Sequence, residues 1–381
     1  MERLHTTYLS LGSNLEDRAY YLQKALFLLG KSAGAIKKIS PVYETPTWGF
    51  SSHNFLNICI ELKTTLKPRQ LLDSILKIES QLGRLRSSSA GYADRKIDID
   101  ILYYDSLVLA DESLVVPHPE LHKRRFVLKP LADIAPQFYH PLLKKDTRNL
   151  LQECKDGSQL KKTSLKLYKN LQELLASLHF VAIEGNIGAG KTTLAQKIAE
   201  DFSAKLVLER FADNPFLPKF YEDQARYAFP LEMSFMADRY QQFTDDTTQF
   251  DLFKNFLVSD YDVYKSLIFA KVTLQTDEFM LYRKVFNFMY QEVKKPQLYI
   301  YLYQTTERLL ENIRKRGRTY EQQITSDYLE KINRGYFDFI KSYPEQNNLI
   351  IDVTELDFVN STTDYEALLD QVIRFSISMQ D

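Results

Sequence analysis

Apolar residues in the first part of the chain follow two kinds of spacing, and each spacing predicts an element. In residues 68–83, leucine and isoleucine recur every three or four positions, which predicts an amphipathic helix. Residues 96–104 alternate between apolar and polar side chains, which predicts a half-buried strand. The same rules predict strands at 6–13 and 54–64, and a helix at 18–30 that ends at Gly30.

This irregular mixture predicts the β-α-β-β-α-β order of a ferredoxin-like α+β domain. The pattern changes after residue 180, where five short apolar runs are separated by helical segments. These runs cover residues 180–183, 205–208, 256–259, 297–303 and 348–353. Regular alternation of this kind predicts an α/β domain with a five-stranded parallel sheet and helices on both faces.

A polar, lysine-rich stretch separates the two patterns. It contains "CKDGSQLKKTSLK" and then a short helical pattern at 171–178. We therefore expect an N-terminal domain over 1–155, a linker over 156–176 and a C-terminal domain over 177–381.

Composition narrows the class of protein. The formal net charge is −1, so no global field favours nucleic acid or a membrane surface as a partner. The two cysteines, Cys59 and Cys154, lie far apart, which argues against a disulfide framework or a zinc site. No signal peptide is visible, and no apolar run reaches the roughly 18 residues of a membrane span. We expect a cytoplasmic globular protein.

Two aspartates in the strand at 96–104 are the first candidate site. Asp98 and Asp100 alternate with three isoleucines, so both carboxylates share one face of the strand. Two carboxylates about 7 Å apart along a strand suit Mg²⁺ with its waters. The alternative is a solvated strand face that carries two acids.

Three arginines near this pair favour a binding site for a triphosphate. Arg84, Arg86 and Arg95 flank the serine-rich segment "SSSAGYAD", which we expect to be a lid loop. Arginines beside a carboxylate-held metal are typical of sites that neutralise phosphate charge.

With these residues in view, the N-terminal part resembles the 6-hydroxymethyl-7,8-dihydropterin pyrophosphokinases over roughly residues 5–150. The resemblance rests on "YLSLGSNL", "VYETPTWG", "GRLRS", "DRKIDIDIL" and "VPHPELHKRRFVLKPL". It implies transfer of pyrophosphate from ATP to the pterin hydroxymethyl group with Mg²⁺ as cofactor. One departure is Tyr92-Ala93-Asp94, where the family usually has Trp-Gly-Pro, and it predicts altered loop closure.

The resemblance also implies roles for single residues. It implies metal binding by Asp98 and Asp100, catalysis on the phosphates by Arg84 and Arg95, and ATP contacts by Arg86, His118 and Arg124. It implies a pterin pocket formed by Thr45, Pro46, Phe55, Asn57 and Phe126. The residue types agree, because aromatic faces sandwich a flat heterocycle and an amide can bind its edge.

A phosphate-binding loop opens the C-terminal part. The stretch "EGNIGAGKTT" fits G-x-x-x-x-G-K-[ST] between a predicted strand and a predicted helix. Backbone N–H groups and the helix N-terminus would hold the phosphates, Lys191 would reach the β- and γ-phosphates, and Thr192 would bind Mg²⁺. The ATP-binding residues expected here are Gly185, Asn186, Gly188, Gly190, Lys191, Thr192 and Thr193. The domain is therefore a P-loop kinase candidate.

Glu209 ends the second strand of this domain, at the edge where such sheets bind ligands. A carboxylate there can take the proton of an attacking hydroxyl group. The alternative is an acid that only forms a salt bridge.

The stretches "DNPFLPKFYED", "LEMSFMADRYQ", "SDYDVYKSLIFAK" and "RKRGRTYE" resemble the deoxynucleoside kinases, most of all the bacterial deoxyguanosine kinases, over roughly residues 178–375. The resemblance implies that Glu209 is the base for the sugar 5′-hydroxyl group and that Asp260 binds Mg²⁺. It also implies that Tyr221 and Glu321 hold the 3′-hydroxyl group, and that a homodimer forms through helices of this half. It implies a basic lid over the phosphates, with Arg314, Arg316 and Arg318 as ATP contacts.

Two departures from that family are informative. Glu232 stands where most members carry Gln, and a carboxylate only accepts hydrogen bonds, so it favours the N1–H and 2-amino donors of guanine. We expect Arg239 to donate to O6 or N7 of the same base. In the stretch Asp260-Tyr261-Asp262, tyrosine replaces the arginine that in family members commonly contacts phosphate and the catalytic glutamate.

The sequence therefore predicts a bifunctional enzyme: a pterin pyrophosphokinase fused to a deoxynucleoside kinase, with ATP, the pterin and a purine deoxynucleoside as substrates. Two alternatives remain: only one half is active, or the C-terminal half prefers deoxyadenosine or is broadly specific. The stretch "DNPFLPKFYED" disfavours a kinase of another small molecule. A nucleotide-gated binding module or nucleic-acid motor is disfavoured by the net charge.

Overall fold

The structure is a computed structural model that describes residues 3–46, 53–84, 94–210, 214–248, 254–291 and 293–380. The chain forms two compact units. The first comprises residues 1–174 and 376–381, and the second comprises residues 175–375.

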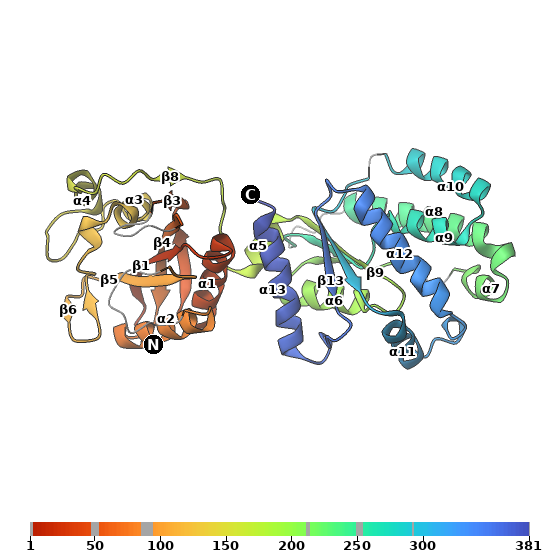
Figure 1. Ribbon diagram of the computed structural model, residues 1–381, viewed down its shortest axis with the longest axis horizontal. Coiled ribbons are helices and arrows are strands. Elements are labelled where there is room, and N and C mark those ends of the chain that lie inside the picture. The colour runs from red at the N-terminus through yellow and green to blue at the C-terminus, as the bar shows by residue number, and fades with distance from the viewer. Residues whose placement is uncertain are drawn as a thin grey trace. The chain divides into compact units, whose positions relative to one another are not determined.

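The first unit is built on an antiparallel sheet (Figure 1). Its strands are β1 (His5–Ser13), β2 (Ala35–Ile39), β3 (Tyr43–Thr45), β4 (Phe55–Thr64), β5 (Asp98–Tyr104) and β8 (Lys161–Lys162). They follow the order β5-β1-β4-β3-β8, and β2 also pairs with β4. The central strands β1 and β4 are almost entirely buried, so they form the middle of the core. This sheet confirms the predicted ferredoxin-like α+β domain.

Helices cover both faces of this sheet. The helices α1 (Arg18–Ser32) and α2 (Pro68–Gln81) bury the apolar stripes that predict them, whereas α3 (Arg125–Ile134) closes a core cluster with β1, β4 and β5. Smaller elements are β6 (Leu109–Ala110), β7 (Val115–Val116), α4 (Thr147–Glu153), α5 (Leu171–Ser177) and a 3-10 turn at Leu121–Lys123. The strand β8 lies inside the predicted linker and pairs with β3.

Gly30 does not end α1, so that prediction is wrong. The helix continues to Ser32, and the Ala33 N–H donates to the Leu29 carbonyl. The turn falls at Gly34, whose φ is 146° and where a Cβ would lie 2.2 Å from the Lys63 carbonyl oxygen. Only glycine fits this close approach of two backbones.

The second unit contains a five-stranded parallel sheet, which confirms the predicted α/β class. Its strands are β9 (Phe180–Gly185), β10 (Lys205–Val207), β11 (Leu257–Ser259), β12 (Leu298–Tyr303) and β13 (Asn348–Asp352), in the order β10-β11-β9-β12-β13. Its helices are α6 (Lys191–Phe202), α7 (Leu217–Glu222), α8 (Gln224–Thr248), α9 (Lys265–Thr273), α10 (Thr276–Met289), α11 (Thr306–Arg316), α12 (Ser326–Ser342) and α13 (Thr362–Ser378), with a 3-10 turn at Thr319–Glu321.

Helices cover both faces of this sheet as well (Figure 1). On one face, α8, α9 and α12 share a core cluster with the strands. On the other face, α6 lies beside α13, where the Lys197 ammonium sits 4.2 Å from the Tyr365 ring centroid. The carboxyl ends of β9, β10 and β11 remain accessible, and they carry the candidate site of this unit. Within the described residues, no helix has the length and apolar character needed to cross a membrane.

Candidate active sites

The strand β5 presents the two aspartates on one face. Ile97, Ile99 and Ile101 are buried on the other face, as predicted. Arg84 Nη1 lies 2.7 Å from one carboxylate oxygen of Asp98, and Arg95 Nη1 lies 2.6 Å from the other. The pair lines a cleft whose lining includes Glu79, Arg84, Arg95, Asp98, Asp100, His118 and Arg124. The structure therefore gathers the predicted metal and phosphate residues of this half, except Arg86, which lies outside the described residues.

Asp100 has weaker partners than Asp98. His118 Nε2 and Arg124 Nη1 lie 4.0 and 3.9 Å from its carboxylate, beyond hydrogen-bond distance. Burial, together with the charge of Asp98, raises the pKa of Asp100 to about 7. A buried carboxylate whose nearest cations lie about 4 Å away, beside a second carboxylate on the same strand face, fits a hard divalent cation.

His118 has a defined tautomer in this cleft. Its Nδ1 accepts the backbone N–H of Glu120 at 3.2 Å, so the proton of the neutral ring sits on Nε2, which faces Asp100. Burial and the nearby Arg124 lower the pKa of His118 to about 4. A neutral donor of this kind suits a phosphate oxygen.

Two residues outside the predicted set organise the cleft. Glu79 is buried, pairs with Arg84 and accepts the Ile99 N–H at 2.9 Å, so it fixes Arg84 against β5. Asn14 donates to Asp94 Oδ1 at 2.6 Å and accepts the Arg95 N–H at 2.7 Å. Asn14 follows β1 in "YLSLGSNL", but the sequence gives no sign of its partners on the far side of the loop.

The predicted pterin residues lie mostly on β3 and β4. Asn57 Nδ2 donates to Thr45 Oγ1 at 2.7 Å, and both side chains are buried. Gly12 pairs with Asn57 across the sheet, where a Cβ would lie 3.0 Å from Asn57 Oδ1. Phe55 is half-buried beside them on β4, and Pro46 is exposed. The half-buried Phe126 packs against the core cluster under α3.

In the second unit the phosphate loop joins β9 to α6. Gly188 and Gly190 have φ values of 85° and 87°, and a Cβ on Gly190 would lie 2.8 Å from Phe358 Cζ. Lys191 Nζ donates to the Asn186 carbonyl at 2.9 Å. Burial and the neighbouring Lys265 lower the pKa of Lys191 to about 8. The loop therefore has the compact shape that a phosphate cradle requires.

Asn186 contributes to this loop through its position. Its Nδ2 donates to the Leu329 carbonyl and to Asn333 Oδ1, both at 2.8 Å, so its side chain ties the loop to α12. Among the predicted ATP contacts, Asn186 can therefore face phosphate only with its backbone.

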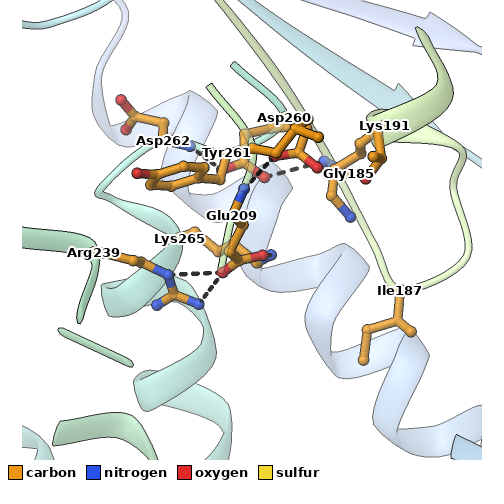
Figure 2. A network of polar contacts seen from close by, with 12 residues as sticks. Gly185, Ile187, Lys191, Glu209, Arg239, Asp260, Tyr261, Asp262 and Lys265 are labelled. Atoms are coloured by element: carbon orange, nitrogen blue, oxygen red, sulfur yellow. Dashed lines mark hydrogen bonds and ion pairs between the residues drawn. The ribbon is translucent and has the colours of Figure 1, made fainter. Parts of the chain in front are cut away.

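Asp260 connects the phosphate loop with Glu209 (Figure 2). One carboxylate oxygen accepts the Thr192 hydroxyl, and the other accepts the Glu209 N–H at 2.8 Å. A hydroxyl and a carboxylate in contact at the end of a P-loop fit a Mg²⁺ ion that also binds phosphate oxygens.

Two buried cations hold the Glu209 carboxylate (Figure 2). Arg239 donates from Nε and Nη2 to Oε1 at 2.9 and 2.6 Å, and Lys265 Nζ lies 2.5 Å from Oε2. Burial alone would raise the pKa of Glu209, but Lys265 and Arg239 outweigh it and hold the pKa well below the usual range. Glu209 is therefore an oriented, ionised acid.

The contacts of Arg239 differ from the prediction. Besides its two bonds to Glu209, its Nη1 donates to Ser266 Oγ at 2.7 Å, so the guanidinium positions the acid, and its donation to O6 or N7 of a base stays a prediction. Sequence reasoning missed Lys265. A signal existed, since Lys265 is the first cation after the Asp260-Tyr261-Asp262 stretch that lacks the expected arginine.

Glu232 lies at the far end of the same cavity. It is 2% exposed, and Oε1 accepts the Thr273 hydroxyl at 3.1 Å. Its Oε2 has no hydrogen-bond partner within the described part of the chain. Burial raises the pKa of Glu232 to about 7, although Arg239 acts in the opposite direction. The cavity therefore presents a buried acceptor that a ligand can satisfy.

The predicted lid arginines lie on and after α11. Arg316 and Arg318 both pair with Glu321, with Arg318 Nη1 at 3.2 Å from Oε1. Tyr221 stacks on Tyr320, and burial raises the pKa of Tyr221. These residues line the cavity of Glu209 and Glu232. Arg314 is exposed and is not among the described residues that line this cavity or the adjoining phosphate cleft.

The geometry defines two nucleotide-handling units in one chain, and comparison with known proteins agrees. The family model "7,8-dihydro-6-hydroxymethylpterin-pyrophosphokinase (HPPK)" matches residues 8–136, and the family model "Deoxynucleoside kinase" matches residues 181–377. The chain belongs to both families, so each half is a kinase, as the resemblances predict.

Two relatives each match one half of the chain, and a third matches a longer stretch. The deoxyguanosine kinase of Bacillus subtilis is 37% identical over 50% of this chain and 93% of that protein. The 2-amino-4-hydroxy-6-hydroxymethyldihydropteridine pyrophosphokinase of Aquifex aeolicus is 44% identical over 41% of this chain and 94% of that protein. The bifunctional protein FolKE of Lactococcus lactis is 33% identical over 64% of this chain and 61% of that protein.

Proposed function

We propose that the first unit transfers pyrophosphate from ATP to 6-hydroxymethyl-7,8-dihydropterin and that the second phosphorylates the 5′-hydroxyl group of deoxyguanosine. The observation that carries the second assignment is Glu232, a buried carboxylate in the cavity of Glu209 whose Oε2 has no hydrogen-bond partner among the described residues. The deoxyguanosine kinase of B. subtilis, which matches this half over nearly its whole length, supports it.

In the first unit, Asp98 and Asp100 would hold Mg²⁺, which supplies charge neutralisation at the ATP phosphates. Arg84 and Arg95 form ion pairs with Asp98 in the structure. Their N–H groups would donate to phosphate oxygens when ATP and the metal bind. The pterin hydroxymethyl oxygen would bond to the β-phosphorus as its proton passes to solvent, the bond from that phosphorus to the α-phosphate oxygen would break, and AMP would leave. The buried amide of Asn57 would bind the edge of the pterin ring.

In the second unit, Glu209 would accept the proton of the sugar 5′-hydroxyl group while the 5′-oxygen bonds to the γ-phosphorus. The bond to the β-phosphate oxygen breaks, and ADP leaves. Thr192 and Asp260 would hold Mg²⁺, and Arg316 and Arg318 would face the phosphates. Phosphoryl transfer has a loose transition state, so an oriented carboxylate of low pKa is sufficient as the acceptor.

Guanine satisfies Glu232 better than the other bases. Its N1–H and 2-amino group present two adjacent donors to a carboxylate, whereas adenine offers an acceptor at N1. Hypoxanthine retains N1–H, so deoxyinosine would be a weaker substrate of the same kind.

The test is ATP-dependent phosphorylation by the whole purified chain of deoxyguanosine, deoxyinosine, deoxyadenosine, deoxycytidine and thymidine. The proposal expects deoxyguanosine to have the highest kcat/KM and deoxyinosine to follow. Preference for deoxyadenosine or a pyrimidine would show that Glu232 does not read guanine. Pyrophosphorylation of the pterin tests the first unit in the same preparation, and AMP release serves as its measure.

We also propose that the kinase half forms a homodimer through α10. Met280, Leu281 and Phe288 are 57, 54 and 78% exposed. They lie within about 100° of one another around the helix, so they form one apolar stripe.

A further inference from the structure

Lys265 is a buried cation whose position is set by the backbone that precedes it. The Asp262 carboxylate accepts the Tyr264 N–H at 3.0 Å, and the Asp262 N–H donates to Glu184 at 2.6 Å. The Lys265 N–H then donates to the Asp262 carbonyl at 3.1 Å and begins α9. This fixed turn directs the side chain towards Glu209, not towards solvent.

The Glu209 carboxylate does not need two cations for its stability alone. Arg239 already gives one oxygen a two-pronged interaction and is itself only 4% exposed at the side chain. Removing a second ammonium group from water is unfavourable unless its environment compensates. Lysine is rarely buried, yet the Lys265 side chain is only 9% exposed.

The two cations reach Glu209 from different elements. Arg239 belongs to α8 and binds Oε1, whereas Lys265 belongs to α9 and binds Oε2 (Figure 2). Asp260 holds the backbone N–H of Glu209 from the end of β11. With both oxygens and the backbone N–H held, rotation of the carboxylate about its Cγ–Cδ bond is restricted, and removing Lys265 would leave only the Arg239 contact at Oε1 to restrict it.

Lys265 also lies near Lys191 of the phosphate loop. It lines the cavity together with Lys191, Thr192 and Asp260, and its charge contributes to the lowered pKa of Lys191. An ammonium group there faces both the acid and the position where transferred phosphate would carry its charge.

We propose that Lys265 is the positioning residue of the kinase site, which holds Oε2 of Glu209 so that this carboxylate meets the sugar 5′-hydroxyl group. The inference rests on the proposed role of Glu209. When the 5′-hydroxyl proton passes to Glu209, the carboxyl group loses its charge while the transferred phosphoryl group brings negative charge to the same cavity. Lys265 therefore keeps a counter-charge throughout the step.

The experiment compares Lys265→Met and Lys265→Arg with Glu209→Gln and a matched control, Lys271→Met. Lys271 lies on the same helix, is 57% exposed at the side chain and contacts only Asp338 among the described ion pairs. We expect Lys265→Met to lower kcat for deoxyguanosine about 10- to 100-fold with KM changed less than about threefold. Lys265→Arg should restore most of kcat, and Lys271→Met should match the wild type.

The outcomes separate this inference from the proposed function. If Glu209→Gln abolishes activity while Lys265→Met keeps the wild-type kcat, the inference is overturned and the role of Glu209 stands. If Glu209→Gln retains activity, both are overturned. A rise in KM alone for Lys265→Met would mean that Lys265 binds substrate uniformly and does not position Glu209.

Melting temperatures of all variants control for folding. If Lys265→Met unfolds under assay conditions, Lys265→Ala is assayed with propylammonium and, as the neutral comparison, propanol. Recovery of kcat with propylammonium only supports the inference. Equal results with both additives overturn it.

Discussion

At the scale of single residues, Glu209 and Glu232 are two buried acids of one cavity with opposite environments, because Lys265 and Arg239 outweigh burial and lower the pKa of Glu209, whereas burial raises the pKa of Glu232. Because a carboxylate only accepts hydrogen bonds, the sequence predicts that Glu232 favours guanine, and the structure adds that this carboxylate is buried and that its Oε2 has no partner within the described part of the chain. Arg239 lies two helical turns further along α8, which suggested a shared base. Its actual partner, Glu209, lies 30 residues away, and sequence spacing carries no information on such a contact.

The first prediction concerns base selection by Glu232→Gln. The glutamine amide can donate to N1 of adenine. Facing guanine, its NH₂ group would meet one of the two N–H donors of the base, and two donors cannot form a hydrogen bond. We expect the ratio of kcat/KM for deoxyguanosine over deoxyadenosine to fall about 100-fold, the size of one lost base contact. Glu222→Gln, at an exposed acid, is the control. An unchanged ratio would contradict the assignment of Glu232.

The same variant has a second expected effect, on stability against pH. The pKa of Glu232 is about 7 in the folded chain and 4.5 as its ordinary value. Between these values the unfolded state loses the proton while the folded state keeps it, so rising pH destabilises the fold. Glu232→Gln should therefore gain about 3 kcal/mol in unfolding free energy relative to wild type between pH 4.5 and 7.5. Thermal unfolding of both proteins across this pH range measures the difference in unfolding free energy. A difference that does not change with pH would show that the pKa of Glu232 is not raised by folding.

At the scale of elements, long and strongly patterned segments were predictable. All five strands of the kinase sheet form within two residues of their predicted bounds, because each is a buried apolar run between helices. The short strands β2 and β3 were missed, since β2 reads as polar and β3 has three residues. The end of α1 was misplaced because the helix runs to Ser32 with Ala33 as its C-cap, and glycine is needed only at position 34, at the close approach to β4.

The third prediction tests the turn that joins β9 to α6. Gly190 has φ 87°, and a Cβ would lie 2.8 Å from Phe358 Cζ, so Gly190→Ala must shift the phosphate loop. We expect at least a 100-fold loss of deoxynucleoside kinase kcat/KM, with a melting temperature lowered by a few degrees. Gly157→Ala is the matched control, because nothing lies within 4 Å of a Cβ there. Full activity of Gly190→Ala would show that the loop tolerates a displacement.

At the scale of the whole molecule, the two units have separate cores and separate candidate sites, which predicts independent activities. Asp98→Asn combined with Asp100→Asn should remove pterin pyrophosphorylation and leave deoxynucleoside phosphorylation within about twofold. Lys191→Met should do the reverse. Both activities are measured in each preparation. Loss of both from either change would mean that one half depends on the other.

The oligomeric state is also a property of the whole molecule. An exposed stripe of Met280, Leu281 and Phe288 on α10 is costly in water, and burying it between two copies would remove that cost. We expect the whole chain to be a dimer by light scattering after size exclusion, and Phe288→Lys to shift it towards monomer at micromolar concentration. Leu142→Lys changes an equally apolar side chain, 59% exposed, in the first unit and should leave the mass unchanged. A monomeric wild type would contradict the proposed dimer. A Phe288→Lys dimer as stable as the wild type would mean that the interface lies elsewhere. The kinase activity of the Phe288→Lys monomer then shows whether catalysis requires the second copy. We expect this activity to persist, because Glu209, Glu232 and Lys265 all line a cavity within one chain.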